Sequence, residues 1–333
     1  KGMVNIETFS SGGHISINTI DLTEGNLGGL YFKGLIMRLK AIPNPGQKFL
    51  YWIVNGKQVN KRMFNFNPES NGIIEAVFIK DSQSELPCII SENTTLTKAN
   101  SPYYAKCDIE ISKGAIVTIE KGVQILMEKH RSIIVKGGLI CKGTSIEPIS
   151  IRPNPNTETT EWGALCIDNA TSRIELTHIN LSGGTWYDDK PKYKATITSL
   201  NSEVSLNYVT VESSHFPFYS EYGTVSIRNS RLTSSKTCDL INVKYATNAL
   251  VENCDLPGND YPDTDAIDYD GIDNGVIKGN NIYGFFGTNS DAIDIGEASS
   301  DILIEGNRIL NMTDKGISIG QGSSAIIRNN LIV

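Results

Sequence analysis

A repeated six-residue pattern in the C-terminal part of the chain constrains its fold more than any other feature. An aliphatic residue opens the pattern, Asn or Gly occupies its third position, and a second aliphatic residue closes it. Clear copies recur every 23 to 27 residues and begin at Ile227, Val251, Ile277, Ile304 and Ile327. Looser copies begin at Leu176 and Leu206. A period in this range is typical of repeat folds in which each structural unit stacks on the one before it.

A second repeat runs in step with the first and indicates strands. Segments in which apolar and polar residues alternate begin at Leu240, Ala266, Ala292 and Gly316. Alternation with a period of two predicts a β-strand, and no helical pattern separates the segments. The sequence therefore predicts an all-β fold, a parallel β-helix. Its coils would stack an aliphatic column made of Ile241, Ile267, Ile293 and Ile317.

The turns of this predicted β-helix also carry a pattern. Asn280, Asn307 and Asn330 occupy equivalent places in successive repeats. Stacked Asn side chains can form an amide ladder that satisfies buried polar groups. We therefore expect these three residues to be structural.

The N-terminal residues do not share the repeat, so the chain is predicted to have two domains. Residues 1–80 form a small all-β module in which Trp52 and Phe78 are core residues, and a linker lies near residues 81–85. Residues 81–333 form the β-helix. Its last repeat ends at Ile332, which predicts a β-helix that is incomplete at its C-terminus and part of a longer chain.

Composition excludes several classes of function. The 333 residues carry 30 Lys and Arg against 37 Asp and Glu, a formal net charge of −7. A surplus of acidic groups opposes general binding to nucleic acid, whose phosphates require Lys and Arg. No apolar run approaches the roughly 20 residues of a membrane-spanning helix. We expect a monomer with no nucleic-acid partner and no membrane span.

The cysteines are scattered, and none forms the C-x-x-C pair typical of zinc or redox sites. A chain of this length does not require disulfides for stability, so free buried thiols are the simpler expectation. The six residues are Cys88, Cys107, Cys141, Cys166, Cys238 and Cys254.

Acidic residues concentrate in two neighbouring repeats. In the predicted register Asp268 and Asp294 point outward and stack about 4.8 Å apart. Oxygen-rich clusters of this kind suit Ca²⁺. The alternative is a solvated acidic surface or Asp side chains in turns. Seven carboxylates lie within nineteen residues: Asp255, Asp260, Asp263, Asp265, Asp268, Asp270 and Asp273. The proposed calcium ligands are Asp268, Asp270, Asp294 and Glu297.

Two lysines flank these acids. Lys244 occupies the coil before Asp270, and Lys315 occupies the coil after Asp291. A Lys beside carboxylates usually forms an ion pair; the alternative is a general base of the kind a polysaccharide lyase requires. No His lies in the acidic coils, which gives no support to a His-based triad. The candidate catalytic residues are Asp265, Asp268, Asp291 and Asp294, with Lys244 or Lys315.

Segments of these coils resemble the motifs of polygalacturonase-type hydrolases. The strings are 264–268, 290–295 and 315–320, and they stand in the same order as N-T-D-G, G-D-D and G-H-G-x-S-I-G. The resemblance implies that Asp265 and Asp291 match acids of that site. Ser290 replaces one Asp and Lys315 replaces the His, changes that oppose the usual hydrolytic chemistry.

A longer resemblance covers nearly all of residues 85–333. Strings at 101–104, 239–245, 263–271 and 314–322 are similar to the β-helix region that follows the kinase domain in bacterial CotH-type surface proteins. This resemblance implies a right-handed, single-stranded parallel β-helix of the pectate-lyase-like superfamily, in a secreted or cell-surface protein of the bacterial envelope. Residues 36–52 and 75–78 resemble small all-β bacterial surface repeats.

Three functions follow as hypotheses. The first is a module that binds an extended polysaccharide or cell-envelope glycan, with Ca²⁺ as a possible cofactor. The second is a metal-assisted polysaccharide lyase or a polygalacturonase-like glycoside hydrolase. The third is a structural spacer without a ligand.

Overall fold

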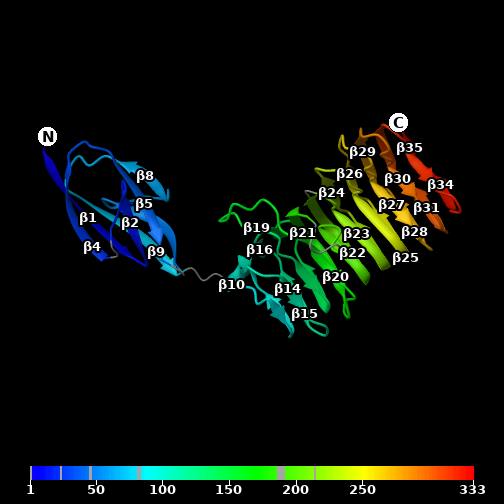
Figure 1. Cartoon of the computed structure of the whole chain (residues 1–333), viewed down its shortest axis with the longest axis horizontal. Coiled ribbons are helices and arrows are strands. Elements are labelled where there is room, and N and C mark those ends of the chain that lie inside the picture. The colour runs from blue at the N-terminus through cyan, green and yellow to red at the C-terminus, as the bar shows by residue number, and fades with distance from the viewer. Residues whose placement is uncertain (1, 23–24, 45–46, 81–83, 186–191, 214) are drawn as a thin grey trace. The chain divides into compact units, whose positions relative to one another are not determined.

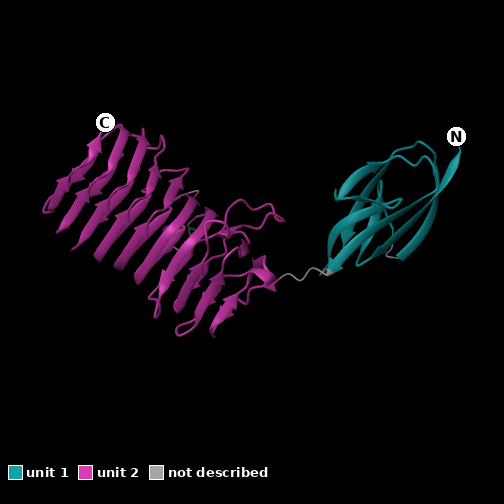
Figure 2. Cartoon of the chain, turned by 180° about the vertical axis from the view of Figure 1, so that it is seen from behind, with its two compact units in different colours: residues 1–83 teal, residues 84–333 magenta. Residues whose placement is uncertain are grey.

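The computed structural model describes residues 2–22, 25–44, 47–80, 84–185, 192–213 and 215–333. The chain divides into two compact units, residues 1–83 and 84–333 (Figure 2). The described residues form strands and one short 3-10 helix, η1 (Lys98–Asn100). Among them, no helix has the length and apolar character required to cross a bilayer.

The N-terminal unit is a sandwich of two sheets. One sheet has the strand order β4-β1-β9-β6-β7, the other β3-β2-β5-β8. Trp52 is fully buried between them, and its indole Nε1 donates a hydrogen bond to the Lys61 carbonyl at 2.9 Å. Phe78 packs against this core and is partly buried. The strands are β1 (Met3–Ser11), β2 (Gly13–Ile17), β3 (Ile20–Asp21), β4 (Gly25–Phe32), β5 (Met37–Pro43), β6 (Gln47–Val54), β7 (Lys57–Val59), β8 (Met63–Phe66) and β9 (Gly72–Lys80).

The second unit is a right-handed parallel β-helix whose coils stack along one axis (Figure 1). Each coil contributes a strand to three parallel rows, here called the first, second and third row. The four long strands run around corners and belong to more than one row. They are β21 (Ile174–Gly184), β22 (Ile197–Ser213), β23 (Phe218–Arg228) and β25 (Ile241–Glu252).

The remaining strands belong to one row each. The first row holds β11 (Ile89–Ile90), β14 (Ile109–Ile111), β17 (Ile133–Val135), β20 (Leu165–Asp168), β27 (Ile267–Asp270), β30 (Ile293–Ile295) and β33 (Ile317–Ile319). The second row holds β12 (Thr94–Leu96), β15 (Ile116–Glu120), β18 (Gly138–Lys142), β28 (Gly275–Lys278), β31 (Ile302–Glu305) and β34 (Ala325–Arg328). The third row holds β10 (Ser84–Glu85), β13 (Tyr103–Ala105), β16 (Gln124–Met127), β19 (Ile149–Pro153), β24 (Arg231–Ser234), β26 (Asp255–Pro257), β29 (Asn281–Phe285), β32 (Arg308–Met312) and β35 (Leu331–Ile332).

The predicted aliphatic column is confirmed in the first row. Ile241 pairs with Ile267, Ile267 with Ile293, and Ile293 with Ile317. The first three are fully buried, and Ile317 is partly buried against the same core. Because side chains alternate along a strand, the residue after each isoleucine lies on the opposite side of the sheet.

The predicted Asn ladder is confirmed as well. The Asn280 side-chain Nδ2 donates to Asn307 Oδ1 at 3.0 Å, and Asn307 Nδ2 donates to Asn330 Oδ1 at 2.9 Å. The Asn307 backbone N–H also donates to Asn330 Oδ1, at 2.9 Å. The ladder satisfies backbone and side-chain groups at the corner between the second and third rows, which is a structural role.

The expectation of free cysteines is wrong for one pair. Cys88 and Cys107 form a disulfide that joins the first coils of the β-helix. The other four cysteines are free and buried, as expected. The six-residue repeat does not extend into these first coils, so it gave no register that would bring Cys88 beside Cys107.

Candidate functional site

The candidate site lies on the outward side of the first row, where β25, β27, β30 and β33 are neighbours. We call it the acidic face. Its side chains form three ladders that run along the helix axis, one residue from each coil per ladder. The members are Asp239, Asn242, Lys244, Asp265, Asp268, Asp270, Asp291, Asp294 and Lys315.

The first ladder stands just before the strands and binds backbone amides. Asp239 Oδ1 accepts the Asp265 N–H at 3.1 Å, Asp265 Oδ1 accepts the Asp291 N–H at 2.6 Å, and Asp291 Oδ1 accepts the Lys315 N–H at 2.9 Å. One oxygen of each carboxylate is thus used to hold the next coil. Asp265 and Asp291 were predicted from the sequence as catalytic candidates, and the structure gives each a structural bond besides.

The second ladder lies on the strands themselves. Asp268 pairs with Asp294 across adjacent coils, as predicted. Asn242 Nδ2 donates to Asp268 Oδ2 at 2.6 Å and to Asp239 Oδ2 at 2.7 Å. Asn242 is only 6% exposed, and its Oδ1 has no hydrogen-bond partner. An unpartnered buried amide oxygen is costly, so this atom is a candidate acceptor for a ligand hydroxyl or amine.

The third ladder contains an ion pair. Lys244 pairs in register with Asp270, and its Nζ contacts Asp270 Oδ2. In the next coil the equivalent position is Gly296, and a Cβ built there would lie 1.7 Å from Asp270 Oδ1. Asp270 therefore uses the space that this glycine leaves, and a larger residue at 296 would displace it.

Crowding raises the pKa of the carboxyl groups on this face. Burial is the main cause for Asp268, with the carboxylates of Asp239 and Asp270 adding to it, and its pKa rises to about 8. Burial likewise raises the pKa of Asp265, to about 7, although the hydrogen bond from the Asp291 amide opposes the shift. Burial also raises the pKa of Asp294. The acidic face therefore retains protons near neutral pH.

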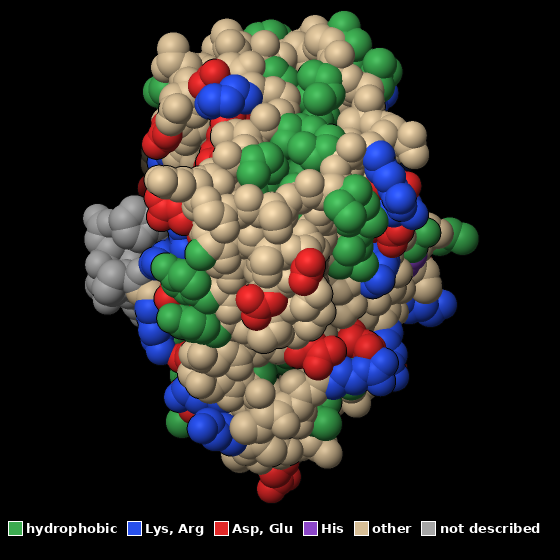
Figure 3. Space-filling model, turned by 90° about the vertical axis from the view of Figure 1, so that its right-hand side faces the viewer, with side chains coloured by type: hydrophobic (Ala, Val, Ile, Leu, Met, Phe, Trp, Pro, Cys, Tyr) green, Lys and Arg blue, Asp and Glu red, His purple; other side chains and the backbone are tan. Residues whose placement is uncertain are grey.

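Both lysines are held as cations. Burial lowers the pKa of Lys244, but the hydrogen bond to Asp270 and the nearby carboxylates outweigh it, and the net shift is upward. Lys315 Nζ lies 3.1 Å from Asp291 Oδ2, and this contact raises its pKa. Figure 3 shows Lys and Arg side chains beside Asp and Glu side chains at several places on one face of the molecule. The geometry favours the ion-pair interpretation of both lysines over the general-base one.

The predicted calcium ligands do not converge. Asp268 and Asp294 are neighbours, but Asp270 is paired with Lys244, and Glu297 is exposed beyond Gly296. Within the described ranges, no three His, Cys, Asp or Glu side chains are grouped so that they could hold a metal ion. The four predicted ligands therefore do not gather around a common point.

The dense acidic segment 255–273 does not form one cluster. Asp255 lies in the third row, where it pairs with Arg231, on another side of the β-helix. Asp260, Asp263 and Asp273 are exposed in the segments between strands. These residues are close together in the sequence, but the coil places them on different sides of the β-helix.

Two members of the face, Asp239 and Asn242, were not among the site residues predicted from the sequence. The signal was present in the repeat, because the string at 239–242 matches those at 265–268 and 291–294, each with Asp, an apolar pair, and Asp or Asn. Aligning the repeats by this four-residue string instead of counting acids would have found both residues.

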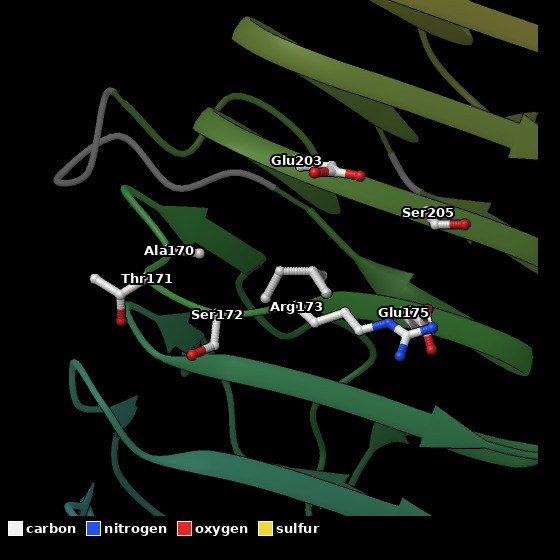
Figure 4. A pocket seen from close by; sticks show the side chains of 8 residues that line it. Ala170, Thr171, Ser172, Arg173, Glu175, Glu203 and Ser205 are labelled. Atoms are coloured by element: carbon white, nitrogen blue, oxygen red, sulfur yellow. Dashed lines mark ion pairs between the residues drawn. The ribbon is translucent and has the colours of Figure 1, made fainter.

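Hollows also lie elsewhere on the described part of the β-helix. One, about 480 Å³, is lined by residues 170–175 with Glu203 and Ser205. Figure 4 shows its labelled side chains, among which Arg173 reaches Glu175 in an ion pair. Its charged groups are largely exposed and have no buried polar partner comparable to Asn242. Another hollow lies on the third row and is lined in part by Tyr208.

A comparison with protein families agrees with the fold. Residues 195–333 match a family model described as a right handed beta helix region, and the acidic face lies within that range. Among solved structures, Dex49A from Penicillium minioluteum aligns at 10% identity with a TM-score of 0.25, covering 96% of this chain and 73% of that one. That likeness is too weak to indicate function. No curated protein matches the chain.

Proposed function

We propose that the acidic face binds an extended polysaccharide. The observation that carries the proposal is the registered ladder of Asp268 and Asp294 next to the unpartnered, buried Asn242 Oδ1. Polar groups recur along the axis at the strand spacing of about 4.8 Å. A linear polymer whose units are comparably long can meet an equivalent group in each coil, which a compact ligand cannot.

The charge of the face supports a choice of substrate class. Its six carboxyl groups are opposed by two lysines, both already paired with Asp270 and Asp291. A uronic-acid polymer would bring further negative charge to this surface and be repelled. We therefore propose a neutral glycan or an amino-sugar polymer. Protonated carboxyl groups on Asp265 and Asp268 can donate hydrogen bonds to sugar oxygens as well as accept them.

Calorimetric titration with defined hexasaccharides tests this proposal. We expect chitosan hexamer, whose amino groups the carboxylates of the face can bind, to bind, and oligogalacturonate not to bind. The double variant Asp268→Asn with Asp294→Asn should weaken binding by about tenfold or more, because it changes the charge and the donors of the face. Asp260→Asn, an exposed carboxylate away from the face, is the matched control. Undiminished binding by the double variant would remove the proposal.

A second candidate function is glycoside hydrolysis. One observation favours it: the pKa of Asp265 and Asp268 is raised to about 7 and about 8, while Asp291 in the next coil is held beside Lys315. A protonated carboxyl group and a nearby carboxylate are the acid and the base that this chemistry uses. The lyase alternative is less favoured, because both lysines have raised pKa values and are poor bases near neutral pH.

Release of reducing ends separates hydrolysis from binding alone. If the chain hydrolyses a glycan, Asp265→Asn should abolish release while binding is largely retained. Products with ultraviolet-absorbing unsaturated ends would instead indicate a lyase. If no hexasaccharide binds or is cleaved, the spacer hypothesis is favoured. Binding of Ca²⁺ at the acidic face and a secreted or cell-surface location stay predictions.

A further inference from the structure

A groove on the third row combines a flat aromatic surface with polar side chains. We call it the aromatic groove. Its volume is about 390 Å³, and it crosses four successive coils at the residues Asn180, Thr210, Arg231 and Asp255. The acidic face lies on the first row, so the aromatic groove is a separate site.

Two stacked rings form the aromatic surface. The His178 and Tyr208 rings are nearly parallel, at 4° between planes and 4.5 Å between centroids. Both residues have a positive φ, 47° and 56°, and occupy the corner between the second and third rows. In the following coils the same corner holds Asn229 and Asn253, also at positive φ. The ring stack therefore ends at Tyr208, a residue that is 49% exposed.

A turn in the preceding coil forms one wall of the groove. Thr144, Ser145 and Pro148 line the groove there. The turn is closed by Glu147, whose N–H donates to Thr144 Oγ1 at 3.1 Å. The Glu147 carboxylate is held by Lys98 and Lys121, and these contacts lower its pKa to about 2. These contacts restrain the turn that forms the wall, and a restrained wall loses less entropy when a ligand binds.

The polar lining is electrically balanced. Arg231 and Asp255 are the charged residues of the lining, and they form an ion pair with each other. The other polar groups are amides and hydroxyls, which can both donate and accept hydrogen bonds. A nucleic acid also stacks on aromatic rings, but its phosphates require unpaired cations, which this lining lacks. A ligand with an apolar ring face and many hydroxyl groups fits better.

We infer that the aromatic groove binds a neutral pyranose chain. The face of a sugar ring that carries C–H groups packs on Tyr208, whose ring face is electron-rich. The sugar hydroxyls bind the amide of Asn180, the hydroxyl of Thr210 and the Arg231–Asp255 pair. These side chains belong to successive coils, so a sugar ring seated on the free face of Tyr208 has several of them within its surroundings. The aromatic groove would bind this sugar chain independently of any binding at the acidic face.

The test compares two tyrosines with matched surroundings. Tyr222 also lies at a corner with a positive φ of 55°, is 48% exposed and stacks on another ring, that of Tyr245, but it does not line the aromatic groove. Tyr208→Asn and Tyr222→Asn each remove a ring while keeping a residue that tolerates positive φ, so both variants should fold. Melting curves confirm this before binding is measured.

Cellohexaose, laminarihexaose and mannohexaose are the probes, titrated by calorimetry. We expect at least one to bind the whole chain, with Kd raised about tenfold by Tyr208→Asn and unchanged by Tyr222→Asn. The inference is wrong if none of the three binds, or if Tyr208→Asn leaves Kd unchanged. A variant with Asp265→Asn and Asp294→Asn distinguishes the two sites. Binding that this variant retains supports the groove. Binding that this variant loses, and that Tyr208→Asn retains, assigns the sugar to the acidic face.

Discussion

Asp268 illustrates how a single half-buried carboxyl group links the candidate site to stability. Its pKa rises from 3.8 to about 8 on folding, mainly through burial. The folded chain therefore binds more protons than the unfolded chain between about pH 4 and pH 8, and the free energy of unfolding falls as pH rises through that window. Below about pH 4 the Asp268 carboxyl group is neutral in the folded and the unfolded chain, so its burial no longer lowers the free energy of unfolding.

Asp268→Asn should remove this pH dependence. The side chain of Asn has the same shape and no charge, so we expect the variant to gain about 1–3 kcal/mol in free energy of unfolding relative to the natural chain at pH 8, and to differ little at pH 4. Denaturant titration of the whole chain at both pH values, followed through the unfolding of residues 84–333, measures the difference. Asp260→Asn, which is exposed, should show no such trend. An equal gain at pH 4 would show that the effect is not ionisation.

There is a physical reason why some residues of the acidic face were predictable from the sequence and others were not. Asp268 and Asp294 were predictable because each follows a buried isoleucine, and alternation along a strand sends the next side chain outward. Asn242 obeys the same rule but is not acidic, so a search for charge passed over it. The pairing of Lys244 with Asp270 followed from coil length. The raised pKa values of Asp265 and Asp268 could not be predicted from the sequence, because they depend on how deeply each carboxyl group is buried.

Among the elements, the corner between the second and third rows depends on the Asn ladder. Asn307 is 1% exposed; its Nδ2 donates to the Ile277 carbonyl at 2.9 Å, and its Oδ1 accepts the Asn280 backbone N–H at 2.9 Å. Asn307→Ala leaves these buried groups unpaired and should lower the free energy of unfolding by about 2–4 kcal/mol. Equilibrium denaturation measures the loss. Asn248→Ala, an exposed Asn in β25, is the control and should cost much less.

The first coils depend on a covalent link instead. The Cys88–Cys107 disulfide joins the segments before β11 and β14, where the strands are only two and three residues long. Because a stacked coil contacts mainly its neighbours, its loss is expected to act locally. Cys88→Ser with Cys107→Ser should speed amide hydrogen exchange in β10 to β14 and leave β27 and β30 unchanged. Exchange that also rises in β27 and β30 would show that the coils unfold as one unit.

These elements also separate what sequence predicts from what it does not. The coils from residue 227 onward were predictable because each repeats an aliphatic–Asn or Gly–aliphatic pattern, and stacking such coils buries a continuous column. The first coils lack that pattern, so neither their register nor the disulfide could be predicted. The groove at Tyr208 was not predicted either, because it depends on the turn at residues 144–148, which is distant in the sequence.

At the scale of the molecule, the two units bury separate cores. Trp52 belongs to a cluster within residues 1–83, and the isoleucine column belongs to a cluster within residues 84–333. A core that is not shared gives each unit its own unfolding equilibrium. Trp52→Ala should therefore lower the transition of the N-terminal unit by about 3–5 kcal/mol and leave that of the β-helix in place.

Scanning calorimetry of the whole chain can resolve the two transitions, and a sugar ligand can label one of them. A hexasaccharide bound in the aromatic groove stabilises only the folded β-helix, by an amount that grows with ligand concentration relative to Kd. The upward shift should appear in the β-helix transition of both the natural chain and Trp52→Ala, and in neither N-terminal transition. A common shift of both transitions would mean that the units unfold together.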